Sequence, residues 1–210
     1  MATANVKQVE IPKLNLQRIA LTLVGDSELI MHRWSDKAKK MMLDKQMTRA
    51  QPQKETRDPE AEYHESYYKY PGGGYGFPSV CFKHSAVKAC TQVEGIPMTT
   101  ANKGFHVNGE FVKIEGDEPH MREDLVRLNG KTADLRYRAG FLNWWCTLDI
   151  TFNADVFSEE MVINLFNVAG FGCGIGEMRP EKTGKGHGRF HVADAAELGK
   201  LGLLAKEAAE

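Results

Sequence analysis

Residues 170–192, GFGCGIGEMRPEKTGKGHGRFHV, decide the fold, because the elements on either side of this glycine-rich stretch give it one structural role. The stretch holds seven of the chain's 20 glycines. A P-loop is excluded, since Gly184-Lys185 is followed by Gly186 where Ser or Thr is needed. A dinucleotide-binding fingerprint is excluded as well, because Glu177 stands where its third glycine would be.

The flanking residues predict a loop that runs from a helix to a strand. Ser158 is a good N-cap, Glu159 and Glu160 suit the first turn of a helix, and Gly170 ends it. Residues 188–192, GRFHV, alternate like a strand. Glycines let the connecting loop turn sharply and let another backbone come close. With four basic residues against two acidic ones, the loop can follow a sugar-phosphate backbone, or it can be a flexible surface loop.

The composition is that of an ordinary globular protein. Of the 210 residues, 42% are hydrophobic and 26% are charged, which is sufficient for one substantial core. No run approaches the roughly 18 apolar residues of a membrane span, and the N-terminus lacks a signal peptide's apolar centre. We therefore expect no membrane partner and a cytoplasmic location. The four cysteines lack C-x-x-C spacing, which predicts reduced packing residues and no zinc site.

The charge distribution is uneven although the net charge is only −1. A near-neutral chain is not coated in positive charge, which argues against indiscriminate nucleic-acid binding. Residues 33–57 nevertheless hold eight Lys or Arg against three acidic residues, and residues 58–65 reverse the sign. Such neighbouring segments indicate either solvated helix faces or one interacting surface.

The order of elements predicts an α+β protein with excursions from a core. Apolar alternation indicates strands, Ser caps indicate helices, and a polar stretch rich in proline, glycine and tyrosine indicates a loop. Tyr67, Tyr68 and Tyr70 near its end can stack on bases or pin the loop to the core. The predicted strands are 19–23, 111–114, 144–152 and 188–192, and the predicted helices are 35–47 with a Ser35 cap, 79–93 with a Ser79 cap, 158–170, and the tail from 193.

Three stretches in this order resemble the RAMP superfamily of CRISPR-associated proteins. Residues 19–32, IALTLVGDSELIMH, resemble the family's first strand, and residues 76–90, GFPSVCFKHSAVKAC, resemble the start of its first helix. Residues 174–192 resemble its signature glycine-rich loop with the G-x-G-R-Φ-x-V ending. The chain departs from the family at His84, where glycine usually follows the lysine. It also resembles uncharacterised proteins of tailed phages and prophages.

The resemblance implies a single domain over residues 1–210 with insertions at about 33–76 and 96–140. Its core would be an RRM-like, ferredoxin-like β-α-β-β-α-β arrangement with a thumb-like insertion and a glycine-rich loop before the last strand. The implied function is binding of single-stranded nucleic acid, RNA in preference to DNA, along its backbone. Subunits would form a homo-oligomer, a side-by-side helical filament, in the cytoplasm of a bacterial host cell, with no cofactor.

Basic side chains and loop glycines are the candidate contacts to the nucleic acid, because phosphates dominate such binding. Arg136 and Arg138 lie in TADLRYRAGF, residues 132–141, which can equally be an edge strand with solvated arginines. The full set of predicted contacts is Lys83, His84, Lys88, Arg136, Arg138, Gly174, Gly176, Arg179, Lys182, Lys185, His187 and Arg189.

Two other functions fit the sequence. Some RAMP proteins cleave RNA, and His32, Asp36, His84, His187 and His191 carry side chains suited to acid-base chemistry or metal binding. No triad or metal signature supports them, so no catalytic or metal residue is assigned. The remaining alternative is a phage virion or assembly protein that acts through protein–protein contacts alone.

Overall fold

The computed structural model describes residues 11–47, 56–128 and 132–203. The protein is a mixed α+β chain with three antiparallel sheets among the described residues. Its central sheet has the strand order β10-β1-β9-β5. These strands are β10 (Phe190–Val192), β1 (Leu16–Gly25), β9 (Trp145–Asn153) and β5 (Phe105–Val107).

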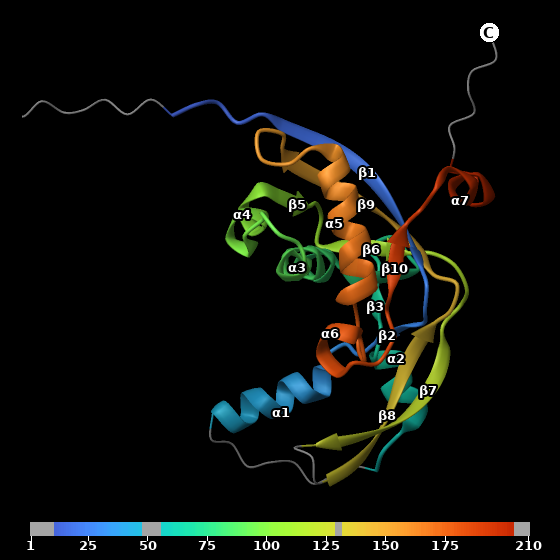
Figure 1. Ribbon diagram of the computed structural model, residues 1–210. Coiled ribbons are helices and arrows are strands. Elements are labelled where there is room, and N and C mark those ends of the chain that lie inside the picture. Colours follow the sequence, from blue (N-terminus) through green and yellow to red (C-terminus); the bar gives the residue numbers. More distant parts are fainter. Residues whose placement is uncertain (1–10, 48–55, 129–131, 204–210) are drawn as a thin grey trace, which may run out of the picture.

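Two helices pack on one face of the central sheet (Figure 1). In sequence, α3 (Ser79–Ala89) lies between β1 and β5, and α5 (Glu159–Gly172) lies between β9 and β10. Alternate residues of the strands point toward these helices, so Leu21 and its partner Leu148 are buried. Their side chains join Phe82 of α3 and Phe166 of α5 in one hydrophobic core.

The helix caps explain where the core helices begin. Ser158 accepts a hydrogen bond from the Met161 amide at the start of α5, as predicted, and α5 runs two residues past Gly170. The predicted Ser79 cap is wrong, because Pro78 occupies the N-cap position of α3. The buried Ser79 hydroxyl instead donates to the Gly109 carbonyl and ties α3 to the loop before β6 (Phe111–Ile114). The strand predicted at 111–114 is confirmed.

A second sheet extends from the core as a long hairpin. Its order is β2-β8-β7, with β2 (Leu29–Met31), β8 (Thr132–Phe141) and β7 (His120–Leu128). The strand at 132–141 is confirmed, but within the described residues β8 is central in its sheet rather than an edge strand. The third sheet has the order β3-β4-β6, with β3 (Tyr68–Lys69) and β4 (Tyr75–Pro78).

The remaining helices lie outside the core. They are α1 (Asp36–Gln46), α2 (Pro59–Glu65), a 3-10 turn (Cys90–Gln92), α4 (Met98–Gly104), α6 (Pro180–Thr183) and α7 (Ala195–Lys200). The Ser35 cap of α1 is confirmed, since its hydroxyl accepts from the Ala38 amide. None of the residues of α1 is buried, so its apolar side chains are not covered by the described residues. The helical tail is confirmed as far as Lys200, and residues 204–210 lie outside the described residues.

Aromatic and sulfur side chains mostly serve packing. Tyr67 and Tyr68 are half-buried and pack against the core. All four cysteines are free, with Cys81 half-buried and the others buried. No helix in the described ranges has the length and apolar character needed to cross a membrane.

Candidate nucleic-acid interface

A hollow of about 460 Å³ opens between α3, the glycine-rich loop and the end of β2. It brings together five of the predicted contacts, which are His84 and Lys88 from α3 and Gly174, Gly176 and Arg179 from the loop. Its other walls are formed by His32, Tyr68, Phe77, Cys81, Ser85, Val87, Met98, Ile175, Glu177 and Glu181.

The glycine-rich loop is a packed element that joins the central sheet to the β2-β8-β7 sheet. The Glu177 amide donates to the Ile30 carbonyl of β2 at 2.9 Å, and the Gly188 amide donates to the Glu28 carbonyl at 2.8 Å. Gly188 has φ +65°, and a Cβ there would stand 1.8 Å from the Ile175 carbonyl oxygen. Only glycine allows this close approach of two backbones. The loop's position beside the hollow is therefore fixed by its backbone.

Two of the loop's four cations are paired within the loop. Arg179 donates through Nε to Glu181 at 3.2 Å and through Nη1 to the Gly176 carbonyl at 3.1 Å. The Lys182 Nζ lies 3.3 Å from a Glu177 carboxylate oxygen. A phosphate that binds either cation must therefore compete with a carboxylate.

The other two loop cations have no carboxylate partner in the part of the chain that the structure describes. The exposed Lys185 Nζ lies 3.9 Å from the Met178 sulfur, and Arg189 donates from Nε to the Gly186 carbonyl at 3.4 Å. Lys185 thus carries an uncompensated charge on the surface of the loop.

The basic residues of α3 divide between two places. His84 and Lys88 are four residues apart, so they share one exposed helix face, and both line the hollow. Lys83 does not line the hollow, because its Nζ lies 3.1 Å from the His106 Nδ1 of β5. Partial burial lowers the pKa of Lys83.

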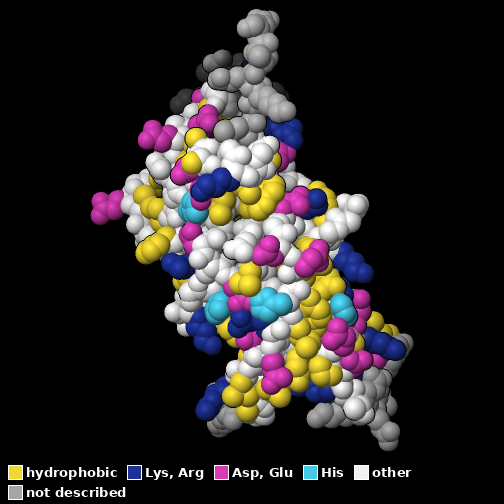
Figure 2. Space-filling model, turned by 90° about the vertical axis from the view of Figure 1, so that its right-hand side faces the viewer, with side chains coloured by type: hydrophobic (Ala, Val, Ile, Leu, Met, Phe, Trp, Pro, Cys, Tyr) yellow, Lys and Arg dark blue, Asp and Glu magenta, His cyan; other side chains and the backbone are white. Residues whose placement is uncertain are grey.

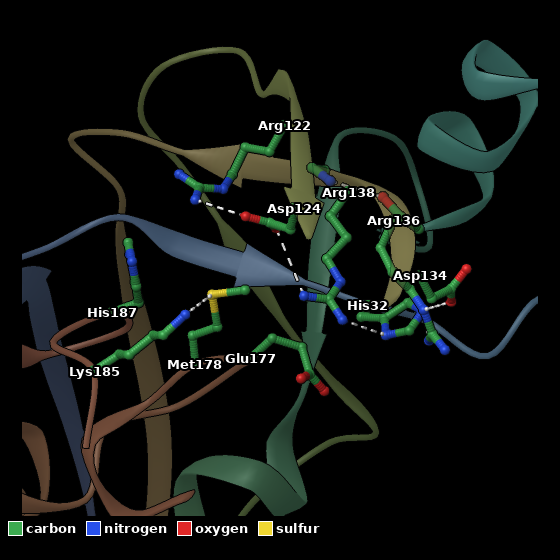
Figure 3. Close-up of polar contacts among 12 residues, drawn as sticks. His32, Arg122, Asp124, Asp134, Arg136, Arg138, Glu177, Met178, Lys185 and His187 are labelled. Atoms are coloured by element: carbon green, nitrogen blue, oxygen red, sulfur yellow. Dashed lines mark hydrogen bonds and ion pairs between the residues drawn. The ribbon is translucent and has the colours of Figure 1, made fainter. Parts of the chain in front are cut away.

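The predicted arginines of β8 lie in a charged cluster above the loop, drawn in Figure 3. Arg138 is buried, with its Nη1 3.6 Å from an Asp124 oxygen and its Nη2 3.5 Å from the His32 Nδ1. Arg136 donates from Nε to Asp134 at 2.9 Å. The nucleic-acid contacts predicted for Arg136 and Arg138 stay predictions, and each guanidinium already has a protein partner.

His32 connects this cluster to the hollow. Burial lowers its pKa, and the positive charges of Arg138 and Arg136 lower it further, so the ring is neutral at pH 7. His187, the remaining predicted contact, does not line the hollow, and its Nδ1 lies 3.7 Å from a Glu28 oxygen.

Sequence reasoning missed two polar residues of the hollow, Ser85 and Glu177, and it left Tyr68 open as a base-stacking or a packing residue. Ser85 is 5% exposed, and its hydroxyl has no hydrogen-bond partner among the described residues. An unpaired buried hydroxyl costs free energy that a ligand can recover. The available signal was a serine on the otherwise apolar face of α3, between Phe82 and Ala89.

Comparisons with known proteins yield distant structural neighbours. No family model matches the chain, and no curated protein matches it. Among solved structures, the chain is similar to Cmr6 from Pyrococcus furiosus, a RAMP protein of CRISPR systems, with 10% sequence identity and a TM-score of 0.46. The match covers 86% of this chain and 100% of that chain.

Proposed function

We propose that residues 1–210 form one RRM-like domain that binds single-stranded nucleic acid, RNA in preference to DNA. The order β1, α3, β5, β9, α5, β10 with the sheet order β10-β1-β9-β5 is what a ferredoxin-like β-α-β-β-α-β core requires. The segment at about 33–76 is then one insertion into that core, and the second, predicted at about 96–140, begins only after β5, because this strand belongs to the core. Fold alone does not determine function, so the proposal rests on the site.

The hollow between α3 and the glycine-rich loop is the observation that carries the proposal. It places the exposed Lys88 and His84 opposite loop glycines, beside the half-buried ring of Tyr68 and the unpartnered Ser85 hydroxyl. Cations meet phosphates, an aromatic face stacks on a base, and a hydroxyl bonds a base edge or a ribose. Because the loop is already packed, it does not have to become ordered when nucleic acid binds.

The acidic groups of the hollow make the proposed binding weak and dependent on salt. Glu181 and Glu177 already neutralise Arg179 and Lys182, so these cations contribute only when a phosphate displaces the carboxylate. Lys88 and Lys185 carry no such cost. We therefore assign the main phosphate contacts to Lys88 and Lys185, and a secondary role to Arg179.

Fluorescence anisotropy with a labelled, unstructured RNA and the matching single-stranded DNA tests this assignment. The double variant Lys88→Ala/Lys185→Ala should lower the slope of log K against log salt by about 1.4, at about 0.7 per contact. The control is Lys113→Ala/Lys200→Ala, which removes two exposed lysines from β6 and α7, outside both α3 and the glycine-rich loop. Absence of binding to both strands at low ionic strength overturns the proposal and favours a virion or assembly protein.

A side-by-side filament in the cytoplasm is the form of assembly that we propose. Both signs of charge on one chain of net charge −1 allow neighbouring copies to attract each other. Assembly should then weaken with salt. Light scattering with and without oligonucleotide measures it, and a strictly monomeric protein under both conditions contradicts a filament.

An RNA-cleaving activity is the second candidate, because His32 and His84 line the same hollow. Two imidazole rings in one hollow can serve as general base and general acid. Asp36 and His191 lie elsewhere, paired with Lys39 and Glu197 respectively. Labelled RNA incubated with the protein reports cleavage. Loss of cleavage in His84→Gln with retained binding supports this candidate, and intact RNA after long incubation removes it.

A further inference from the structure

Helix α1 presents an apolar stripe that no described residue of the chain covers. Trp34 is 51% exposed, Met41 is 42% exposed and Met42 is 45% exposed. Met41 and Met42 are neighbours on α1, and Trp34 directly precedes its Ser35 cap. An isolated helix of eleven residues is marginal in water, and tertiary packing of an apolar face normally supplies its stability. The stripe is therefore expected to have a partner.

The outer face of the β7–β8 hairpin presents a second uncovered apolar surface. Leu125 of β7 lies directly opposite Leu135 of β8, and Met121 shares their face because it is four residues from Leu125. Their exposed fractions are 64%, 38% and 45%. Figure 2, which views the molecule from the hairpin side, shows hydrophobic side chains gathered in the lower part with acidic groups beside them.

The two surfaces carry opposite charge. Four lysines flank the stripe on α1 against two aspartates, and Lys40 and Lys45 are exposed. The hairpin face includes the exposed Glu123 and Arg127, and the segment of α2, which packs against β8, adds four acidic residues from Asp58 to Glu65 against one arginine, Arg57. Opposite charges around the two apolar centres favour docking of α1 on the hairpin. They disfavour docking of α1 on α1 or of hairpin on hairpin.

The two surfaces do not meet within the described chain, because Met41 and Leu125 are both exposed. In Figure 1, α1 lies at the left of the lower part, while β7 and β8 lie at the right. A contact between them must join two copies. Because the two surfaces differ, the contact is head-to-tail, and each copy added leaves one surface of each kind open.

We propose that α1 of one copy docks on the outer face of the β7–β8 hairpin of the next copy, and that this contact builds an open chain of subunits. Met41 and Trp34 pack against Leu125 and Met121, while Lys45 faces the acidic edge formed by Glu123 and α2. The proposal rests on the proposed function, because it specifies which surfaces join neighbours in the filament.

Two single variants and their mixture test the contact. Met41→Asp destroys the helix surface, and Leu125→Asp destroys the hairpin surface, while each variant keeps the other surface intact. Both residues are exposed, so the melting temperature should not change. Sedimentation velocity should show assemblies that grow with concentration for the unchanged protein and monomers for each variant. The equimolar mixture should stop at a heterodimer of twice 23.5 kDa.

Phe171→Asp is the matched control, because Phe171 is 74% exposed on α5, outside both surfaces, and its variant should assemble like the unchanged protein. The proposal is overturned if the mixture stays monomeric, if either variant still assembles, or if the unchanged protein is monomeric. It is also overturned if the protein stays monomeric and co-sediments with anionic lipid vesicles, and if Met41→Asp abolishes this co-sedimentation.

The same variants separate this proposal from the proposed function. Anisotropy with a hexanucleotide RNA, short enough for one subunit, should give equal affinity for the unchanged protein and the Leu125→Asp variant. Lost assembly with retained hexanucleotide binding supports both proposals. Assembly that follows the prediction without any RNA binding removes the proposed function and keeps the head-to-tail contact.

Discussion

The central sheet and the β7–β8 hairpin bury opposite kinds of side chain. In the central sheet, Leu21 is buried while Asp149 lies on the open face. In the hairpin, Arg138 and Asp124 are buried while Leu125 is exposed. Both follow the same two-residue alternation. The alternation therefore determines which residues share a face, whereas the neighbouring elements determine which face is covered.

The covering elements explain the difference. The apolar face of the central sheet meets α3 and α5, so hydrophobic burial stabilises it. The charged face of the hairpin turns toward the glycine-rich loop, and on this face Arg122 is paired with both Glu28 and Asp124 (Figure 3). Buried charges need such partners. The hairpin should therefore be more sensitive than the core sheet to the loss of one charge.

The largest expected effect is at the loop that joins the two sheets. Gly188→Ala should destabilise the protein by about 4 kcal/mol or more, because its Cβ would overlap the Ile175 carbonyl oxygen. Gly184→Ala is the matched control, with φ +68° and open space around the Cβ, and should cost about 1–2 kcal/mol. Urea unfolding measures both. If both variants lose the same free energy of unfolding, the close approach of Gly188 to Ile175 does not link the sheets.

The next effect compares a buried with an exposed carboxylate. Asp124→Asn should cost about 3 kcal/mol, because it leaves Arg138 buried without its anion. Asp149→Asn breaks an ion pair with the exposed Arg18 and should cost less than about 1 kcal/mol. The double variant Asp124→Leu/Arg138→Met should recover much of the loss. If Asp124→Asn proves as mild as Asp149→Asn, the inverted polarity of the hairpin does not stabilise it.

The smallest effect is a pH dependence at the edge of the central sheet. Burial opposes the charged form of His191, but its hydrogen bonds and charge attraction to Glu197 and Asp26 outweigh burial and raise its pKa above 6.5. The pKa of Glu197 is lowered, first by its bond to the Asp194 amide and then by His191. Thermal unfolding from pH 5 to 9 measures the result.

A raised His191 pKa stabilises the folded state below pH 6.5, and this stabilisation is lost as pH rises through the raised pKa. The lowered Glu197 pKa acts in the opposite sense, since its contribution is lost only as pH falls below 4.5. The unchanged protein should therefore exceed His191→Gln in melting temperature near pH 6, with the difference shrinking at higher pH. A constant difference would assign His191 a role in packing alone.

Much of the fold could be predicted from the sequence because its local signals are strong. Ser158 and Ser35 cap their helices as expected, and the strand at 111–114 has the predicted bounds. The Ser79 cap failed because the preceding Pro78 takes the N-cap position. The short helix α6 was missed although it has Pro180 at its start and Gly184 after its end, which is a recognised signature.

The site could be predicted only in part, because burial depends on contacts between distant segments. The glycine-rich loop was found from its composition, and His84 and Lys88 from the stretch that resembles a RAMP first helix. Gly174, Gly176 and Arg179 of the loop line one hollow with these two residues. The burial of Arg138 was not expected, since nothing in TADLRYRAGF reveals that β2 lies beside it. The unpartnered Ser85 hydroxyl likewise becomes visible only once α3 is packed.

Ultraviolet cross-linking of the protein to a uniformly labelled single-stranded RNA, with mass spectrometry of the linked peptides, tests the proposed interface most directly. The hollow predicts cross-linked peptides from α3, from residues 174–189 of the glycine-rich loop and from the segment of Tyr68. The links should disappear in Lys88→Ala/Lys185→Ala at moderate salt. Cross-links confined to the open face of the central sheet, around Thr147 and Arg18, would contradict the account.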